Sequence, residues 1–229
     1  PSMNTIASSV LDSAVVGVVG DTAWTTAYAR ALDAQSDATV HRVSTATAAE
    51  EALRETTVDC IVTDYTLPEQ SGIDLVDRIR DVTATLPVIL GTTDGSEAIA
   101  SEAIEAGVTD YIAADPPVET AGVGDALERT EYALREAQRS TTQRERARQF
   151  DAIFHDTRSA TWVLDPDGTL TRVNQAARSM VDADVDAVVG DPFWTLPWWP
   201  DDSQTRDDIR RLVDTARGGE FGHAVVIQD

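Results

Sequence analysis

The sequence contains no lysine, one cysteine and no long run of apolar residues. All 18 basic residues are arginine and 40 residues are acidic, so the formal net charge at pH 7 is −22. A surface of this sign repels nucleic acid and anionic membranes, which argues against contact with either. The lone Cys60 excludes an internal disulfide, and we expect a buried, inert thiol. No apolar run reaches the about 20 residues that span a bilayer, and the first residues lack a signal-peptide pattern, so we expect a cytoplasmic protein.

The composition also bears on the salt concentration to which the protein is adapted. Abundant aspartate, threonine and alanine without lysine resembles proteins of salt-loving archaea, whose acidic surfaces stay hydrated while concentrated salt screens the repulsion. The alternative is an acidic protein of ordinary salinity, because acidity concerns solubility rather than function. The 229 residues, 42% of them hydrophobic, suit a domain of about 120 residues and a smaller second one.

Residues 14–118 alternate short β-branched runs with alanine-rich amphipathic segments, the pattern of βα units in a parallel sheet. Strands are expected at 14–19, 38–43, 58–63, 87–92 and 109–113, and their near-continuous apolar character indicates burial on both faces. Helices are expected at 22–35, 46–56, 71–81, 96–106 and from 119 onward. Thr47 stands before Glu50 at capping-box spacing, Ser96 is expected to open a helix and Gly107 to close one. We predict an α/β fold with a (βα)5 doubly wound sheet.

The fifth helix is expected to continue as a linker over residues 119–148, because this stretch contains no proline. Leu127, Leu134 and Thr141 recur at seven-residue intervals within a strongly charged sequence. Two interpretations stay open for this segment: a dimerising coiled coil, or a single helix exposed to solvent.

Polar side chains stand at the carboxyl ends of the predicted strands, where sites gather in open α/β sheets. Asp21 follows the first strand, Asp64 the third, and Thr92 ends the fourth. Two carboxylates and a hydroxyl are therefore expected to face one crevice. In such a crevice an aspartate can act as a nucleophile, and carboxylate oxygens can bind a divalent cation.

The segment DCIVTDYTLP at residues 59–68, followed by SGIDL at 71–75, resembles the phosphorylation segment of response-regulator receiver domains. The resemblance covers residues 14–118 and implies a flavodoxin-like receiver that takes a phosphoryl group from a histidine kinase. It implies that Asp64 is the phosphoacceptor, that Thr92 is the phosphate-binding hydroxyl and that Tyr111 is the switch aromatic. It further implies a Mg²⁺ site made by Asp21, Asp64 and the backbone carbonyl of Thr66.

Two departures from that family weaken the expected site. The family has two adjacent acids after the first strand, and here the first is Gly20; the family's lysine after the fifth strand is replaced by Ala114. Asp94 is a candidate for the missing acid, while Asp115 would add repulsion. Three interpretations of Asp64 stay open: a phosphoacceptor, a degenerate receiver that acts as a phosphorylation-independent interaction or dimerisation module, and an unrelated structural aspartate. Asp21 has the alternative role of capping the first helix.

After Phe150 the pattern changes to a hairpin, with strands at 160–164 and 169–173 around a turn at Asp165–Gly168, and Asn174 capping a short helix. With VNQAA at 173–177 and VGDPF at 189–193, residues 149–229 resemble an α+β PAS sensory domain. Its ligand is left open: the region has no cysteine for a flavin photosensor, and His155 and His223 are poorly placed for haem. The tryptophan-rich stretch 193–199 is expected to pack over the sheet rather than line a ligand site. A further strand is expected at 222–229.

These predictions combine into a receiver domain at 12–118, a helical linker at 119–148 and a PAS-like domain at 149–229. Such a chain relays signals and is not an independent metabolic enzyme. The expected partners are a histidine kinase and a second copy bound through the receiver face or the linker helix. Whether the output is a histidine kinase or a DNA-binding regulator stays open.

Overall fold

The structure, a computed structural model, describes residues 9–68, 70–114, 121–181, 184–221 and 223, with residues 121 and 122 described by their backbone alone. The chain divides into two compact units, residues 1–143 and 144–229. Each unit has its own hydrophobic core.

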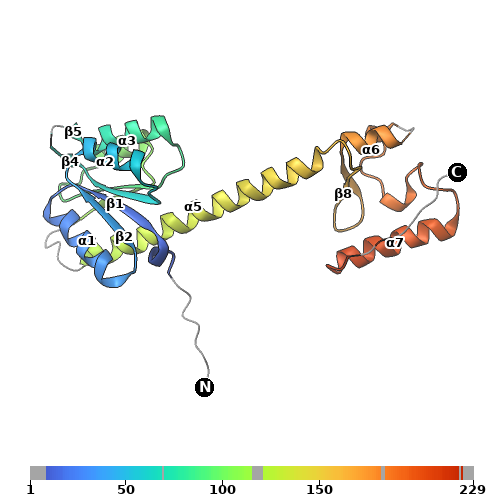
Figure 1. The fold of residues 1–229 in the computed structure, drawn as a ribbon, viewed down its shortest axis with the longest axis horizontal. Helices are drawn as coiled ribbons and strands as arrows, with labels where there is room; N and C mark the ends of the chain where they lie inside the picture. Colours follow the sequence, from blue (N-terminus) through green and yellow to red (C-terminus); the bar gives the residue numbers. More distant parts are fainter. Residues whose placement is uncertain (1–8, 69, 115–120, 182–183, 222, 224–229) are drawn as a thin grey trace, which may run out of the picture. The chain divides into compact units, whose positions relative to one another are not determined.

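The first unit is built on a five-stranded parallel sheet in the order β2-β1-β3-β6-β7 (Figure 1). This order with helices on both faces is the flavodoxin-like arrangement, so the predicted fold is confirmed. The predicted strands agree with the observed ones to within two residues at each end. Their bounds are β1 (Val15–Val19), β2 (Thr39–Val43), β3 (Cys60–Asp64), β6 (Val88–Thr92) and β7 (Asp110–Ala113).

Helices cover both faces of this sheet because the strand residues alternate between two apolar clusters. One cluster joins the sheet to α1 and α5, and the other joins it to α2 and α3 (Figure 1). A short antiparallel pair that was not predicted, β4 with β5, follows β3 directly. The remaining bounds are η1 (Val10–Ser13), α1 (Ala23–Gln35), α2 (Ala46–Glu55), β4 (Thr66–Leu67), β5 (Gln70–Ser71), α3 (Gly72–Val82), α4 (Glu97–Ala106) and α5 (Ala121–Phe154).

Helix caps follow the predictions at α4 and depart from them at α2. Ser96 caps the start of α4, and Gly107 closes it with a φ of 84°, a conformation that favours glycine. At α2 the predicted box of Thr47 with Glu50 is wrong, because the helix begins two residues earlier. Thr45 is the cap, and its hydroxyl accepts a hydrogen bond from the Ala48 amide.

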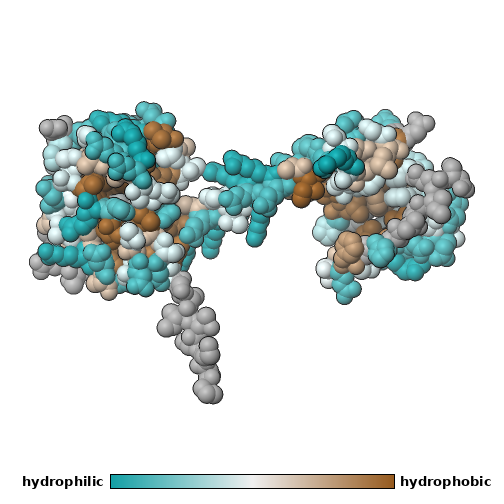
Figure 2. Space-filling model, viewed as in Figure 1, coloured by the Kyte–Doolittle hydropathy of each residue, from teal (hydrophilic) through white to brown (hydrophobic). Residues whose placement is uncertain are grey.

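Helix α5 continues without a break to Phe154, six residues beyond the predicted end of the linker. Leu127 and Leu134, which were considered as a coiled-coil seam, are buried in the core of the first unit. Thr141 is exposed, as are all residues from 138 to 153. Figure 2 shows that the surface of this part of the helix is mostly hydrophilic. The spacing of Leu127 and Leu134 therefore marks the face that packs on the core of the first unit. No helix in the described part of the chain combines the length and the apolar character needed to cross a membrane.

The second unit contains the predicted hairpin. The Gly168 amide donates to the Asp165 carbonyl at 3.0 Å, and Gly168 has a φ of 84°, so the predicted turn is confirmed. Helix α7 was not predicted, and all of the strand expected at 222–229 except residue 223 lies outside the described residues. The bounds are β8 (Trp162–Leu164), β9 (Leu170–Val173), α6 (Gln175–Met180), η2 (Val185–Ala187), η3 (Phe193–Thr195) and α7 (Ser203–Arg217).

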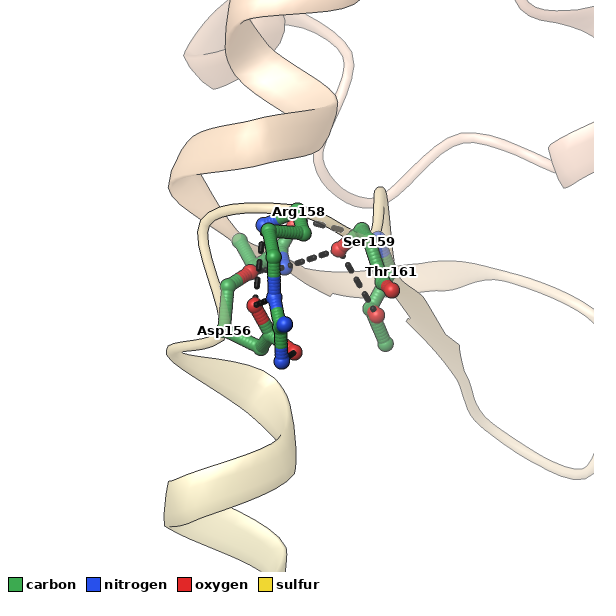
Figure 3. Close-up of polar contacts among 5 residues, drawn as sticks. Asp156, Arg158, Ser159 and Thr161 are labelled. Atoms are coloured by element: carbon green, nitrogen blue, oxygen red, sulfur yellow. Dashed lines mark hydrogen bonds and ion pairs between the residues drawn. The ribbon is translucent and has the colours of Figure 1, made fainter.

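Asn174 joins the end of α5 to the hairpin and to α6. Its buried side chain accepts hydrogen bonds from the amides of Thr161 at 2.9 Å and Ala177 at 2.8 Å. Its amide nitrogen donates to the carbonyls of Ser159 at 2.7 Å and Asp156 at 3.3 Å. Figure 3 shows this junction, in which the Asp156 carboxylate also accepts hydrogen bonds from the backbone amide and the guanidinium of Arg158. The predicted cap of α6 is thus confirmed, and it also fixes the loop after α5.

The tryptophan-rich stretch packs over the hairpin, as predicted. The Trp199 indole donates to the Phe193 carbonyl at 2.7 Å, and the Phe193 ring lies 6.0 Å from Trp162. Trp194 lies against Gly168, where an added Cβ would come within 2.6 Å of its ring. His155 is exposed and makes an edge contact with Phe154, so it does not point into this aromatic cluster.

Candidate functional site

Asp64 and Thr92 lie side by side at the carboxyl edge of the first unit's sheet. Asp64 ends β3 and is paired in register with Gly91, the residue before Thr92 on β6. Only 4% of Asp64 and 3% of Thr92 is exposed, whereas Asp21, which follows β1, is exposed. A carboxylate buried to this degree needs hydrogen-bond donors or a cation to offset its lost hydration.

Both carboxylate oxygens of Asp64 accept hydrogen bonds from the protein. The Thr22 hydroxyl donates to Oδ2 at 2.5 Å, and the Thr66 amide donates to Oδ1 at 2.9 Å. Thr66 owes this position to the turn that leads from β3 into β4. The contact with Thr22 was missed from the sequence, although a hydroxyl directly after Asp21 at the start of a helix was a signal that could have found it.

Thr22 is held in place by its second role as the cap of α1. Its hydroxyl oxygen accepts a hydrogen bond from the Thr25 amide at 3.4 Å and lies 3.2 Å from the Thr25 hydroxyl. The alternative role considered for Asp21, capping this helix, is therefore wrong. Asp21 is exposed on this loop and does not cap the helix.

Gly20 is fitted to this pocket by its backbone as well as by its size. It adopts a φ of 122°, which side chains rarely tolerate, and an added Cβ would lie 3.0 Å from the Cβ of Asp64. The missing acid therefore coincides with a local backbone conformation that suits glycine. Ala114, where the family carries its lysine, is buried, and Asp115 lies outside the described residues.

Thr92 and Tyr111, the two residues expected to switch, differ in the hydrogen bonding of their hydroxyl groups. The Thr92 hydroxyl accepts a hydrogen bond from the Asp94 amide at 3.2 Å. Tyr111 packs in a small cluster with Leu90, and its buried hydroxyl has no hydrogen-bond partner among the residues that the structure describes. An added Cβ on Gly95 would lie 3.0 Å from that hydroxyl, so the ring tip abuts the loop between β6 and α4. The side chain of Asp94 is exposed.

The oxygen donors at this edge suit a hydrated Mg²⁺. They are the carboxylates of Asp21 and Asp64 and the backbone carbonyl of Thr66. Across the described chain, no group of three or more acidic, histidine or cysteine side chains could hold a metal. Mg²⁺ usually retains several waters and takes only one or two carboxylates alongside phosphate oxygens. The residues present therefore fit this ion with few protein ligands.

Cys60 begins β3 and is fully buried. Burial raises the pKa of its thiol to about 12, so at neutral pH the thiol stays protonated and is a poor nucleophile. The prediction of an inert cysteine is confirmed. Asp64 is the buried carboxylate at the carboxyl end of the same strand.

Comparison with known proteins finds a similar family for each of the two units. Residues 16–116 match the response regulator receiver domain family, and residues 154–226 match the PAS fold family. Chemotaxis protein CheY1 of Helicobacter pylori is 39% identical over 54 residues, which cover 23% of this chain and 44% of that protein. Sensor histidine kinase TmoS of Ectopseudomonas mendocina is 36% identical over 59 residues, 26% of this chain and 6% of that protein.

Solved structures agree on the fold of the first unit. The signal receiver domain of an HD domain-containing protein from Pseudomonas fluorescens Pf-5 gives a TM-score of 0.50 at 22% identity, covering 59% of this chain and 94% of that one. The chain spans less than half the length of these two curated relatives.

Proposed function

We propose, from a receiver domain at 16–116 followed by a PAS fold at 154–226, that this chain relays a phosphorylation signal in a two-component system. Asp64 accepts a phosphoryl group from a histidine kinase, and α5 carries the change to the PAS module and to an output domain. The kinase is one partner, and a second copy bound through the receiver face is another. The acidic, lysine-free composition supports a cytoplasmic protein adapted to high salt.

The observation that carries this proposal is the position of Asp64. It is a buried carboxylate at the carboxyl end of a central parallel strand, next to the Thr92 hydroxyl, with Asp21 on the neighbouring loop. Polar side chains at this edge are the usual site of function in doubly wound sheets. A purely structural aspartate has no need of a neighbouring acid and hydroxyl at the same edge.

The transfer follows from the groups present. An oxygen of Asp64 forms a bond to phosphorus while the phosphorus–nitrogen bond of the kinase phosphohistidine breaks, and the imidazole nitrogen keeps the electron pair. Bound Mg²⁺ supplies charge neutralisation for the phosphoryl oxygens. The Thr92 hydroxyl, which can donate as well as accept, then binds one of those oxygens, and Tyr111 follows the movement of the loop after β6.

Helix α5 is suited to carry the change because it is continuous. Leu134, in the first half of the helix, is buried in the core of the first unit, and at the C-terminal end Phe154 is buried under Arg172, whose guanidinium lies 4.4 Å from the ring centroid. A helix with both ends fixed transmits rotation or displacement along its axis with little loss. The stretch from 138 to 153, between these two buried residues, is exposed and belongs to the same helix.

The second candidate is a receiver that works without phosphorylation. Gly20 and Ala114 remove one acid and the only lysine of the family's site, and the chain has no lysine elsewhere. Without that cation, one of the groups that pair with phosphoryl oxygens is missing. In this alternative the receiver is an interaction or dimerisation module with a fixed conformation.

Phosphoryl labelling distinguishes the two candidates. Wild-type chain, Asp64→Asn and the exposed-site control Asp77→Asn are incubated with acetyl phosphate or a cognate kinase and Mg²⁺ in buffer of high salt concentration. The proposal expects label on wild type and on Asp77→Asn, with none on Asp64→Asn. Absence of label from all three proteins favours the phosphorylation-independent module.

A further inference from the structure

The hydrogen bond from Thr22 to Asp64 links the loop after β1 directly to the side chain of the proposed phosphoacceptor. Thr22 stands next to Asp21, on the same loop as the carboxylate expected to bind Mg²⁺. Its hydroxyl donates to Oδ2, while Oδ1 is held from the other side by the Thr66 amide. Both carboxylate oxygens are therefore already engaged by neutral donors, and Oδ2 is engaged by a side chain of the loop that carries Asp21.

The surrounding residues fix the Thr22 hydroxyl in this orientation. Thr25 is fully buried, and its amide donates to the Thr22 hydroxyl oxygen, so that oxygen acts as acceptor for the helix and its proton is left for Asp64. Gly20 leaves room for this arrangement, since an added Cβ would come within 3.3 Å of the Thr25 methyl carbon. The cap of α1 and the orientation of Asp64 are thus set by one side chain.

We propose that Thr22 is a positioning residue that holds Asp64 in place without a divalent cation and competes with the cation for Oδ2. The inference rests on the proposed role of Asp64 as the phosphoacceptor. A neutral hydroxyl offsets part of the hydration that a buried carboxylate loses. An acid at position 20 would instead aggravate this loss. Cation binding then has to displace a hydrogen bond to a charged group, and this lowers the affinity of the site.

The size of the effect follows from the value of such a bond. Hydrogen bonds to charged groups contribute enough that removing the competitor should tighten cation binding by about tenfold. Thr22→Val removes the hydroxyl and keeps the branched shape. Thr22→Ser keeps the hydroxyl and should retain wild-type affinity. Asp64→Asn should remove the cation site from either background.

A matched control separates this effect from the loss of a helix cap. Thr45 caps α2 in the same way, accepting from the Ala48 amide at 3.2 Å, and its side chain makes no hydrogen bond to Asp64. Thr45→Val therefore loses one cap without touching the site. Mg²⁺ affinity is measured on the full chain by isothermal titration calorimetry at constant ionic strength, in Thr22→Val, Thr22→Ser, Thr45→Val and wild type.

The expected result is tighter Mg²⁺ binding in Thr22→Val alone, by about tenfold over Thr45→Val and wild type. Equal affinity in all four proteins, or no measurable binding in any, overturns the proposal. Weaker binding in Thr22→Val also overturns it, because that result makes the hydroxyl a cation ligand rather than a competitor.

Phosphoryl labelling of the same proteins keeps this inference separate from the proposed function. A tenfold affinity difference without label on any protein supports the role of Thr22 in cation binding and removes the role of Asp64 as phosphoacceptor. Label on wild type with identical Mg²⁺ affinities leaves the phosphoacceptor in place and removes the competition by Thr22.

Discussion

Gly91 provides a quantitative test of how α1 packs behind the Asp64 site. It lies in the buried strand β6, in register with Asp64, and an added Cβ would lie 2.2 Å from Cη2 of Trp24 and 2.5 Å from two further ring carbons. Trp24 is fully buried and stacks on Tyr28 with ring centroids 5.7 Å apart. The indole ring cannot retreat without moving α1, so Gly91→Ala forces a shift of the helix.

The cost can be estimated from overpacked cores. Adding carbon atoms to a well-packed interior destabilises proteins by about 1–3 kcal/mol, and contacts this short place Gly91→Ala in the upper part of that range. Gly17 in β1 is the matched control, because its added Cβ would meet nothing closer than 3.5 Å. Gly17→Ala should be neutral or stabilising by about 0.4–1 kcal/mol, since it reduces the entropy of the unfolded chain.

Chemical denaturation followed by far-UV circular dichroism measures both variants at one salt concentration. A double-mutant cycle with Trp24→Phe, which removes the outer ring carbons, should reduce the penalty of Gly91→Ala to below about 1 kcal/mol. The packing described here is refuted if Gly91→Ala costs no more than Gly17→Ala, or if the penalty is unchanged in the Trp24→Phe background.

Two further predictions concern the site backbone and the second unit. Gly20→Ala should destabilise the chain by about 1–3 kcal/mol, because its φ of 122° and the nearby Cβ of Asp64 disfavour any side chain. Gly124→Ala, in open space on α5, should be neutral or stabilising. Thermal denaturation compares the two variants, and equal effects would contradict this prediction. Asn174→Ala should cost about 2–4 kcal/mol because it leaves the buried amide of Ala177 and the partly buried amide of Thr161 without an acceptor. Hydrogen exchange at Thr161 and Ala177 should accelerate, and unchanged protection would contradict this prediction.

The sheet was predictable because its strands are buried on both faces. Near-continuous apolar runs of four or five residues, separated by polar segments with helical periodicity, leave few alternatives to a parallel α/β sheet. Ser96 and Gly107 were found because each directly adjoins the alanine-rich helical segment of residues 97–106. At α2 three hydroxyl residues precede or begin the helix, Ser44, Thr45 and Thr47, and the sequence cannot tell which of them the chain places at the cap.

The seven-residue recurrence in the linker helix could not be interpreted from the sequence, because two different structures share it. A seven-residue recurrence such as Leu127 and Leu134 serves a coiled-coil seam and a helix packed on a sheet equally well. Only the neighbouring core decides between them, and here both leucines are buried in it. Helix α7 was overlooked because its apolar face is sparse, with Ile209 as its one buried residue among those described.

In the candidate site, position along the chain was predictable and side-chain orientation was not. Asp64 and Thr92 could be placed together because strand ends of a parallel sheet meet at one edge. The contact of Thr22 with Asp64 depends on a rotamer and on the positive φ of Gly20, neither of which the sequence expresses. Gly20 looked like a lost acid, and the structure adds that its backbone is shaped for glycine.

Trapping the acyl phosphate tests the central claim most directly. After incubation with a phosphodonor and Mg²⁺, borohydride reduces an aspartyl phosphate to homoserine, and peptide mass spectrometry locates the reduced residue. The account predicts homoserine in place of Asp64 in wild-type protein, with no reduced aspartate in Asp64→Asn. Reduction at a different aspartate, or none at any position under conditions that label an active receiver domain, would contradict it.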